Sequence, residues 1–243
     1  MELTVLGCSG SYGSPAAGAA CSGYLVREGD TAIWIDCGNG SFVNLQRQID
    51  PADLTAVVIT HTHPDHCVDL YGLHVMYRYG LERTGFPVFA PAGTEEAMGA
   101  LASWGDTFAW LAIDPGDPAP VGDLRLAFSR TDHPPPTYAV ELTNAADRRM
   151  IYTSDTGPNW SVDAFAPGAD VVLSEASYRH DDRRSPIHLS GTQAGAAARA
   201  AGAERLVLTH LWPEVDPAVV VGEGSEAFGA RATLAAVDLV VPI

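Results

Sequence analysis

The sequence predicts an α/β protein in which two β-sheets face each other and helices cover both outer faces, a four-layer αββα sandwich. Short apolar and β-branched runs, separated by Gly and Asp turns, recur along the whole chain. Each half of the chain combines several such runs with at least one helical segment, and no obvious linker divides the halves. At 243 residues the chain is long enough to bury about three quarters of its unfolded surface.

The first half of the chain alternates short strands with helices. Strands are expected at residues 3–6, 24–27, 32–36, 56–60 and 88–90, because these runs are apolar or β-branched and end in turn residues. Helices are expected at residues 41–48, 68–79 and 94–104.

The second half repeats this organisation. Strands are expected at residues 124–130, 137–142, 150–154, 171–174, 206–209 and 237–241. Helices are expected at residues 192–201, with Thr192 at the start and Gly202 as the stop, and at about 217–228. The segment 114–120 is the most linker-like, but it is short enough to be one surface loop. We therefore expect a single domain over residues 1–243.

The amino-acid composition argues against several classes of protein. The net charge is −16, from 14 basic and 30 acidic residues, and every basic residue is an Arg. This balance disfavours a broad nucleic-acid or membrane surface. The first residues resemble a strand rather than a signal peptide, and no apolar run approaches the roughly 18 residues of a membrane span. We expect a cytoplasmic protein whose four Cys are core or loop residues.

A loop rich in metal-binding side chains directly follows the expected strand at 56–60. It reads His61-Thr62-His63-Pro64-Asp65-His66. Since His61 and His63 are one residue apart in an extended segment, their side chains point to the same side and can bind one ion. A turn at Pro64 would direct Asp65 and His66 to a neighbouring point. A His-rich surface turn is the alternative, but three His in six residues favour a loop that serves two metals.

Three further ligand candidates lie just past strand ends: His133, Asp155 and His210. Taken singly, His133 could be a loop residue before three prolines, Asp155 an ordinary turn residue and His210 a packed core histidine. Together with the His-rich loop they would complete two sites. The expected ligands of one ion are His61, His63 and His133, those of the other are Asp65, His66 and His210, and Asp155 bridges the two.

These residues resemble the metallo-β-lactamase superfamily. Its motif His-x-His-x-Asp-His matches positions 61–66, and its later single His, Asp and His match positions 133, 155 and 210. The resemblance spans nearly the whole chain, and it implies a metallo-β-lactamase-like sandwich and a metal-dependent hydrolase. It also implies that Asp36 supports the His-rich loop from behind without binding metal. Without the resemblance, Asp36 is equally well a turn residue after a strand.

The branch of the superfamily is indicated by Asp155, because the β-lactamases themselves carry Cys at this position. The segments at 6–11, 174–178 and 188–192 are similar to the glycine-serine opening, the acidic segment and the His-x-Ser/Thr segment of the ribonuclease Z-like branch. Ribonuclease Z carries a long tRNA-gripping arm between the segments that match His133 and Asp155. Here only 21 residues (134–154) separate them. The chain thus resembles small armless phosphodiesterases, among them cyclic nucleotide phosphodiesterases of actinobacterial type.

The resemblance implies two divalent metal ions, with zinc expected first and manganese or iron also compatible with the nitrogen and oxygen ligands. Two ions about 3.5–4 Å apart would activate a water for attack on phosphorus. Asp65 would orient that water or take its proton, besides binding metal. His188 is the expected general acid for the leaving oxygen, with a surface histidine at a helix start as the alternative. Glu175, in the acidic segment, is expected to support the site.

The expected partner is a small phosphodiester such as a 3′,5′-cyclic nucleotide, rather than extended nucleic acid or a membrane. A homodimer is compatible with the sequence. Arg179, Arg183 and Arg184 could bind a phosphate or ribose edge. Asp181 and Asp182 beside them favour a self-neutralised exposed loop instead. The alternative functions are a ribonuclease Z-like RNA endonuclease, a hydrolase of thioesters, lactones or sulfate esters, and a metal-binding module without catalysis.

The other histidines and aromatic residues of the sequence favour structural uses. His74 lies within an expected helix and His180 in a charged loop. A group of aromatic residues could stack a base, but its helical spacing favours packing. It comprises Tyr71, Tyr77, Tyr79 and Trp104.

Overall fold

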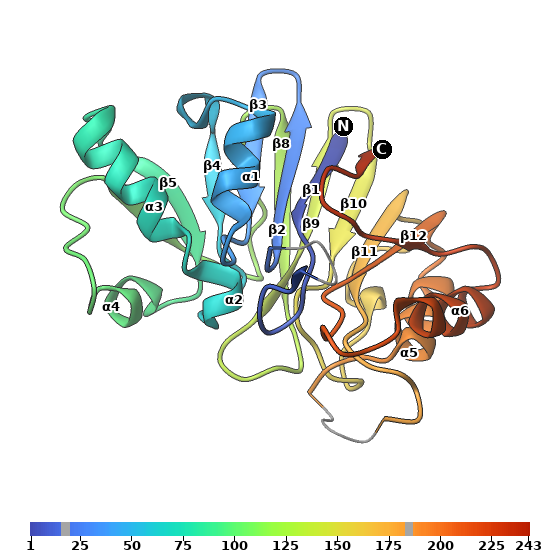
Figure 1. The fold of residues 1–243 in the computed structure, drawn as a ribbon. Coiled ribbons are helices and arrows are strands. Elements are labelled where there is room, and N and C mark those ends of the chain that lie inside the picture. The colour runs from blue at the N-terminus through green and yellow to red at the C-terminus, as the bar shows by residue number, and fades with distance from the viewer. Residues whose placement is uncertain (16–19, 183–186) are drawn as a thin grey trace.

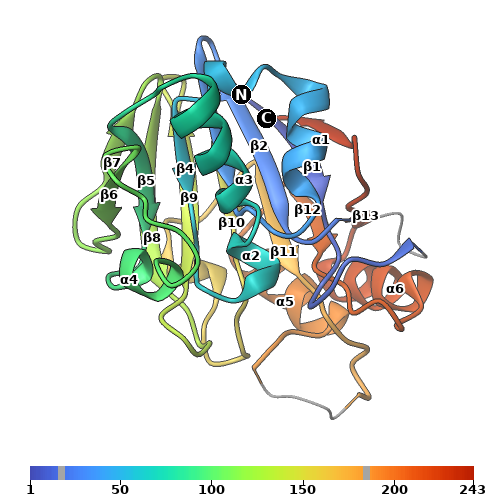
Figure 2. The same cartoon turned by 60° about the vertical axis from the view of Figure 1, so that its left-hand side comes forward.

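Two mixed β-sheets face each other in the computed structural model, which describes residues 1–15, 20–182 and 187–243. Helices lie on the outer faces of both sheets (Figure 1). The turned view shows α1 and α3 in front of the strands of the first sheet (Figure 2). The predicted αββα sandwich is therefore confirmed.

The first sheet has the strand order β14-β1-β2-β3-β4-β5-β6 among the described residues. Strands β3 to β6 run parallel, whereas β1 pairs antiparallel with β2 and β14. The strands are β1 (Glu2–Gly7), β2 (Gly23–Glu28), β3 (Thr31–Ile35), β4 (Ala56–Val58), β5 (Phe86–Ala90), β6 (Phe108–Ala112) and β14 (Val240–Pro242). Its helices are α1 (Ser41–Gln48), α2 (Pro64–Cys67), α3 (Leu70–Val75), continued by a π-helical turn at Met76–Gly80, and α4 (Thr94–Met98), with a 3₁₀ turn at Pro51–Asp53.

The second sheet has the order β13-β12-β11-β10-β9-β8-β7 over the same described ranges. Strands β10 to β13 run parallel, and β7 to β10 form an antiparallel meander. The strands are β7 (Ala119–Val121), β8 (Leu124–Arg130), β9 (Tyr138–Asn144), β10 (Arg149–Tyr152), β11 (Val171–Glu175), β12 (Arg205–Thr209) and β13 (Thr233–Leu234). Its helices are α5 (Gly191–Ala200) and α6 (Pro217–Phe228), with a 3₁₀ turn at Val162–Ala164. None of the helices in the described ranges has the length and apolar character needed to span a bilayer.

Three apolar clusters hold the four layers together. The central one lies between the sheets and combines side chains of both, such as Ile35 and Val58 with Val140 and Leu173. A second cluster joins the first sheet to α1 and α3, and a third joins the second sheet to α5 and α6. Strands buried on both faces explain why β3, β4 and β11 contain unbroken apolar runs, at 32–35, 56–58 and 171–173, instead of alternating apolar and polar residues.

Strand direction brings separate segments of the chain to one edge of the sandwich. The parallel strands of a sheet end at the same edge. Strands β3 and β4 of the first sheet, and β10, β11 and β12 of the second, therefore present the residues that follow them together. Strand β8 has the same direction as β10, because both pair antiparallel with β9. Helix α2 lies at this edge (Figure 1).

Several expected element boundaries were wrong. The helix expected at 94–104 ends at Met98, because Gly99 follows and the Trp104 side chain folds back to donate its indole N–H to the carbonyl oxygen of Glu95. The helix expected at 68–79 begins earlier, at Pro64, and is interrupted between α2 and α3. Strands β6, β7 and β13 were not expected, and β7 begins inside the loop expected at 114–120.

Candidate metal centre

One cluster of ligand atoms joins the His-rich loop after β4 to the loop after β8. The Nε2 atom of His61 lies 3.1 Å from Nδ1 of His63, and Nε2 of His133 lies 3.3 Å from the same atom. The Oδ2 atom of Asp155 lies 3.7 Å from Nε2 of both His61 and His133. Four ligand atoms from three loops thus surround one point, as the donors of a metal ion do.

A second cluster lies beside the first and uses the remaining predicted ligands. The Nε2 atoms of His66 and His210 are 3.2 Å apart. The Oδ2 atom of Asp65 lies 3.3 Å from Nε2 of His210 and 3.7 Å from Nε2 of His66. The structure therefore brings all seven predicted ligands into two adjacent groups, divided between the groups as the sequence predicted.

Asp155 belongs to both clusters. Its Oδ2 atom faces the first, while its Oδ1 atom lies 3.3 Å from Nε2 of His66 and 3.4 Å from Nε2 of His210 in the second. The Oδ1 atom is buried and has no hydrogen-bond partner among the described residues. A buried carboxylate oxygen that accepts no hydrogen bond costs free energy, and a cation between it and the two imidazole nitrogens would remove that cost. The residues therefore fit a bridged metal pair.

In three of the clustered histidines, His66, His133 and His210, the ring nitrogen that faces away from the cluster has its own partner. His66 donates from Nδ1 to Oδ2 of Asp36 at 2.7 Å, and His133 donates from Nδ1 to the carbonyl oxygen of Ile187 at 3.0 Å. His210 has its Nδ1 atom 3.0 Å from the hydroxyl of Ser177. Such partners fix the tautomer and the ring orientation, so that Nε2 keeps its lone pair for a metal ion.

Asp36 lies behind the His-rich loop, where the resemblance placed it. Its carboxylate accepts hydrogen bonds from the amide and hydroxyl of Thr60 at 2.9 and 3.0 Å, from the hydroxyl of Tyr152 at 3.0 Å and from His66. Asp36 is fully buried. It therefore connects β3, the His-rich loop and β10 without facing either cluster.

Three residues just past strand ends have a left-handed backbone. Asp36, Ser154 and His210 have φ values of 56°, 51° and 57°. This region is unfavourable for residues with a Cβ atom, and such strain is retained mainly where it positions functional groups. Here it turns the chain sharply at the edge that carries the clusters. Gly10 packs against His210, where a Cβ atom would lie 2.5 Å from the His210 carbonyl oxygen.

Burial and nearby carboxylates have opposite effects on the pKa values of the clustered histidines. Burial lowers the pKa of His61, His63 and His133, which keeps these imidazoles neutral and able to bind metal. Burial also disfavours a charged His66, but the nearby carboxylates of Asp155, Asp36 and Asp65 outweigh it and raise the pKa. The second cluster thus concentrates negative charge that a divalent cation would balance.

His188 was not predicted as a ligand, but it lies between the two clusters and forms a third group of possible ligand atoms with Asp155 and His210. Its Nδ1 atom is 3.9 Å from Oδ2 of Asp155. Its ring centroid is 5.0 Å from that of His133, and its Nδ1 atom is 3.0 Å from Oε1 of Glu175. Burial alone would lower the pKa of His188, but the charge of Glu175 and its hydrogen bond, together with Asp155, raise the pKa to about 9. In the metal-free protein His188 is therefore a protonated imidazole next to the clusters.

Arg179 is the one predicted phosphate-binding arginine that lies within the described residues. Arg179 is exposed and pairs with Asp181 at 2.9 Å, which favours the self-neutralised loop. Arg183 and Arg184 lie outside the described residues. His180 is also exposed, and its Nδ1 atom is hydrogen-bonded to the Ser190 hydroxyl at 3.1 Å.

The structure adds residues around the clusters that the sequence did not single out. The amide of Ser11 donates to Oδ2 of Asp65 at 2.8 Å, and Ser177 donates its hydroxyl to Oε2 of Glu175 at 2.8 Å. Thr60 and Tyr152 contact Asp36 as described above. The glycine-serine opening at 6–11 was the available signal for Ser11. The acidic segment at 174–178 was the corresponding signal for Ser177. For the hydroxyl groups of Thr60 and Tyr152 the sequence offers no comparable signal.

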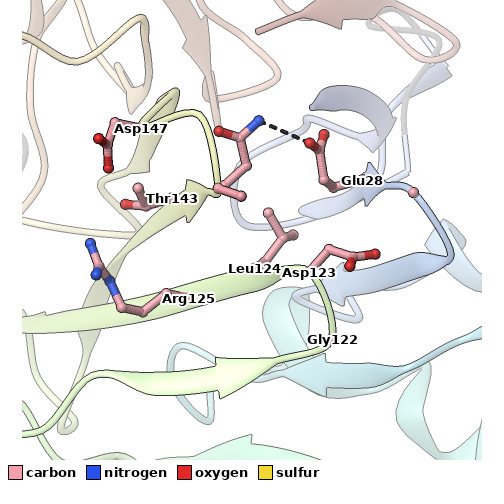
Figure 3. Close-up of a pocket in the computed structure, with 10 residues that line it drawn as sticks. Glu28, Gly122, Asp123, Leu124, Arg125, Thr143 and Asp147 are labelled. Carbon is pink, nitrogen blue, oxygen red and sulfur yellow. Dashed lines mark hydrogen bonds between the residues drawn. The ribbon is translucent and has the colours of Figure 1, made fainter.

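A cavity of about 730 Å³ lies at the opposite edge of the sandwich. It is lined by the turns between β2 and β3, β7 and β8, and β9 and β10, including Glu28, Asp123, Arg125 and Asp147 (Figure 3). The β9–β10 turn precedes β10, whereas Asp155 follows that strand, so the cavity lies away from the clusters. Glu28 is already paired with the N-terminal ammonium and with Asn144.

Comparison with known proteins agrees with this geometry. The family model described as a beta-lactamase superfamily domain matches residues 31–211. An uncharacterized protein of Mycobacterium leprae is 37% identical over 243 residues, covering 94% of this chain and 84% of that protein. The probable metallo-hydrolase YhfI of Bacillus subtilis is 34% identical over 217 residues, 87% of each protein.

The crystal structure of YhfI superposes with a TM-score of 0.89 at 28% identity and covers 99% of this chain and 98% of that chain. Ribonuclease Z of Mycobacterium bovis is 27% identical over 251 residues, covering 89% of this chain and 88% of that protein. The family match includes every residue of the two clusters. The chain therefore belongs to the β-lactamase superfamily, in its ribonuclease Z-like branch of metal-dependent hydrolases.

Proposed function

We propose that the protein is a dinuclear phosphodiesterase that hydrolyses small cyclic phosphodiesters, with 3′,5′-cyclic nucleotides first. The observation that carries this proposal is the position of Asp155, whose two oxygens face two separate groups of ligand atoms. One metal would be held by His61, His63 and His133, the other by Asp65, His66 and His210, with Asp155 shared. Zinc suits this nitrogen-rich set best, and manganese or iron could replace it.

Two bound cations supply an acidified water and neutralise charge on the phosphoryl oxygens. The protein supplies the proton transfers. Burial raises the pKa of Asp65, but the charges of His66 and His210 and the hydrogen bond from His210 have the larger effect. The pKa is lowered overall, so the carboxylate of Asp65 is ionised. It can then orient the attacking water or accept its proton. The amide of Ser11, at 2.8 Å from Oδ2, holds this carboxylate in place.

His188 provides the second proton transfer. A cyclic nucleotide releases an alkoxide, which is a poor leaving group unless an acid protonates it. In the metal-free protein the effect of burial is outweighed by Glu175 and Asp155, which raise the pKa of His188 to about 9 and favour its protonated form, and its ring centroid lies 5.0 Å from that of His133. Glu175 orients its Nδ1 atom, so His188 can act as the acid through its other nitrogen.

The segment that connects His133 to Asp155 supports a small substrate. Strand β9 and strand β10 fill this segment and are joined by the short turn after Asn144. No arm extends from this hairpin in the described chain. A net charge of −16 also provides few phosphate contacts for a polyanion such as RNA.

A ribonuclease Z-like activity is the second candidate, because a relative of that name matches 89% of this chain. A substrate screen separates the candidates. Metal-loaded protein should be incubated in parallel with cyclic AMP, bis(p-nitrophenyl) phosphate, a thioester, a lactone and a tRNA precursor. Conversion of cyclic AMP to AMP supports the proposal. Efficient cleavage of the precursor, with cyclic nucleotides inert, would replace it.

A further inference from the structure

An aromatic rim lies beside the candidate metal centre and has no part in the proton transfers above. It consists of Tyr12, Tyr178 and Trp212. The ring centroid of Tyr178 lies 5.9 Å from that of His188 and 5.9 Å from that of Trp212. The rings of Trp212 and Tyr12 lie 6.0 Å apart, edge to face. A row of rings therefore extends from the expected proton donor toward the molecular surface.

Backbone contacts with the metal-binding segments position two members of this rim, Tyr12 and Trp212. Tyr12 directly follows Ser11, whose amide binds the Asp65 carboxylate. Trp212 follows the candidate ligand His210 by two residues. The Gly10 amide donates to the carbonyl oxygen of Leu211 at 2.9 Å, which joins the two segments. They lie side by side where the dark-blue segment after β1 meets the red-orange segment after β12 (Figures 1 and 2).

Exposure increases along the rim. Tyr178 is buried, Trp212 is half-buried, and Tyr12 is 46% exposed. The backbone that carries the exposed ring is held in place, because the Ser9 hydroxyl donates to the carbonyl oxygen of Tyr12 at 2.7 Å and the Tyr12 amide donates to the carbonyl oxygen of Gly10 at 2.7 Å. The Tyr12 ring itself packs edge to face against Trp212, so it loses less conformational freedom when a ligand stacks on it.

We infer that the aromatic rim binds the base of a nucleotide substrate while the metal centre binds its phosphate. This inference rests on the proposed phosphodiesterase function and specifies its substrate class: phosphodiesters with an aromatic base one ribose away from phosphorus. Uncharged rings suit such a base, and each base offers a π-face for stacking. The rim therefore selects for the presence of a base more than for its identity.

A pair of ligands that differ only in the base tests the inference by binding. AMP and ribose 5-phosphate should be titrated into the metal-loaded protein by calorimetry. The native protein should bind AMP about 5- to 150-fold more tightly than ribose 5-phosphate. Tyr12→Ala and Trp212→Ala should each remove much of this preference, whereas Tyr12→Phe and Trp212→Phe should keep most of it. Tyr79→Ala is the matched control, because Tyr79 is 74% exposed on the π-helical turn.

Steady-state kinetics gives the second readout. Tyr12→Ala should raise KM for cyclic AMP with little change in kcat, and metal content should stay at the native value. Tyr12→Ala also keeps the turn intact, because the contacts of this turn involve backbone atoms of Tyr12. Equal affinity of the native protein for AMP and ribose 5-phosphate, or full preference in both Ala variants, would overturn the inference. A preference for AMP in a protein that hydrolyses no cyclic nucleotide would overturn the proposed function and leave the rim supported.

Discussion

The carboxylate of Glu175 lies 3.0 Å from Nδ1 of His188, and the same carboxylate ties three segments of the site together. Its Oε1 atom also accepts the amide of Thr156, directly after Asp155, at 2.7 Å. Its Oε2 atom accepts the hydroxyl of Ser177, which contacts His210. Glu175 thus orients His188, the expected acid. It also supports two ligand candidates indirectly: Asp155 through the amide of Thr156, and His210 through the hydroxyl of Ser177.

The role of His188 as proton donor can be tested by replacing it with Ala. Turnover of cyclic AMP should fall about 10²–10⁴-fold, because the leaving alkoxide loses its acid. Hydrolysis of bis(p-nitrophenyl) phosphate should fall much less, since p-nitrophenolate leaves without protonation. Metal content, measured by elemental analysis, should persist. His180→Ala is the matched control and should behave like the native protein. Equal losses on both substrates would assign His188 a structural role.

The raised pKa of His188 predicts a pH dependence. The acid form is present below a pKa of about 9 and is lost as pH rises through that value. The value of kcat for cyclic AMP should therefore decline on the alkaline side. Glu175→Gln removes the charge that raises this pKa, so the decline should move to lower pH. Rate profiles of the two proteins measure the shift. A decline that stays in place in Glu175→Gln would mean that another group controls it.

Asp36 should control metal affinity without being a ligand. Asp36→Asn keeps the size of the side chain but replaces one oxygen that accepts hydrogen bonds from His66, Thr60 and Tyr152. Loss of such a supporting partner typically costs about 10–100-fold in metal affinity. Competition with a chromophoric chelator measures this change. Unchanged affinity in a folded Asp36→Asn protein would show that the position of His66 does not depend on this carboxylate.

Substrate size should separate the two candidate functions. Side-by-side assays at physiological salt should give AMP from cyclic AMP and little 3′ processing of a tRNA precursor. RNA binding draws much of its affinity from several basic contacts with phosphates, and the chain has 14 basic against 30 acidic residues. Efficient precursor cleavage that persists at raised salt would contradict this reasoning.

The clustering of the seven candidate ligands could be predicted from the sequence, because metal binding restricts the residue types. His and Asp directly after buried strands stand out in the sequence, and parallel strands bring such positions to one edge. The contacts of Ser177, Thr60 and Tyr152 were not predictable. Hydroxyl residues are common in strands and turns, and their contacts depend on sheet register.

The errors in the predicted fold have a similar origin. The helix expected at 94–104 stops at Met98 because Trp104 returns to Glu95, which is a tertiary contact that periodicity does not contain. The aromatic rim was also missed. Tyr12 and Trp212 are 200 positions apart and meet because the segment 8–10 pairs with the segment 210–211.

The central claim, a bridged pair of metals that hydrolyses a cyclic phosphodiester, is tested most directly by metal titration of the apoprotein during cyclic AMP hydrolysis. Activity should stay low at one equivalent of zinc or manganese and reach its plateau at two per chain. Asp155→Ala should lose most of the bridged pair and most of this activity. Full activity at one equivalent, with a stoichiometry that stays at one, would contradict the dinuclear account.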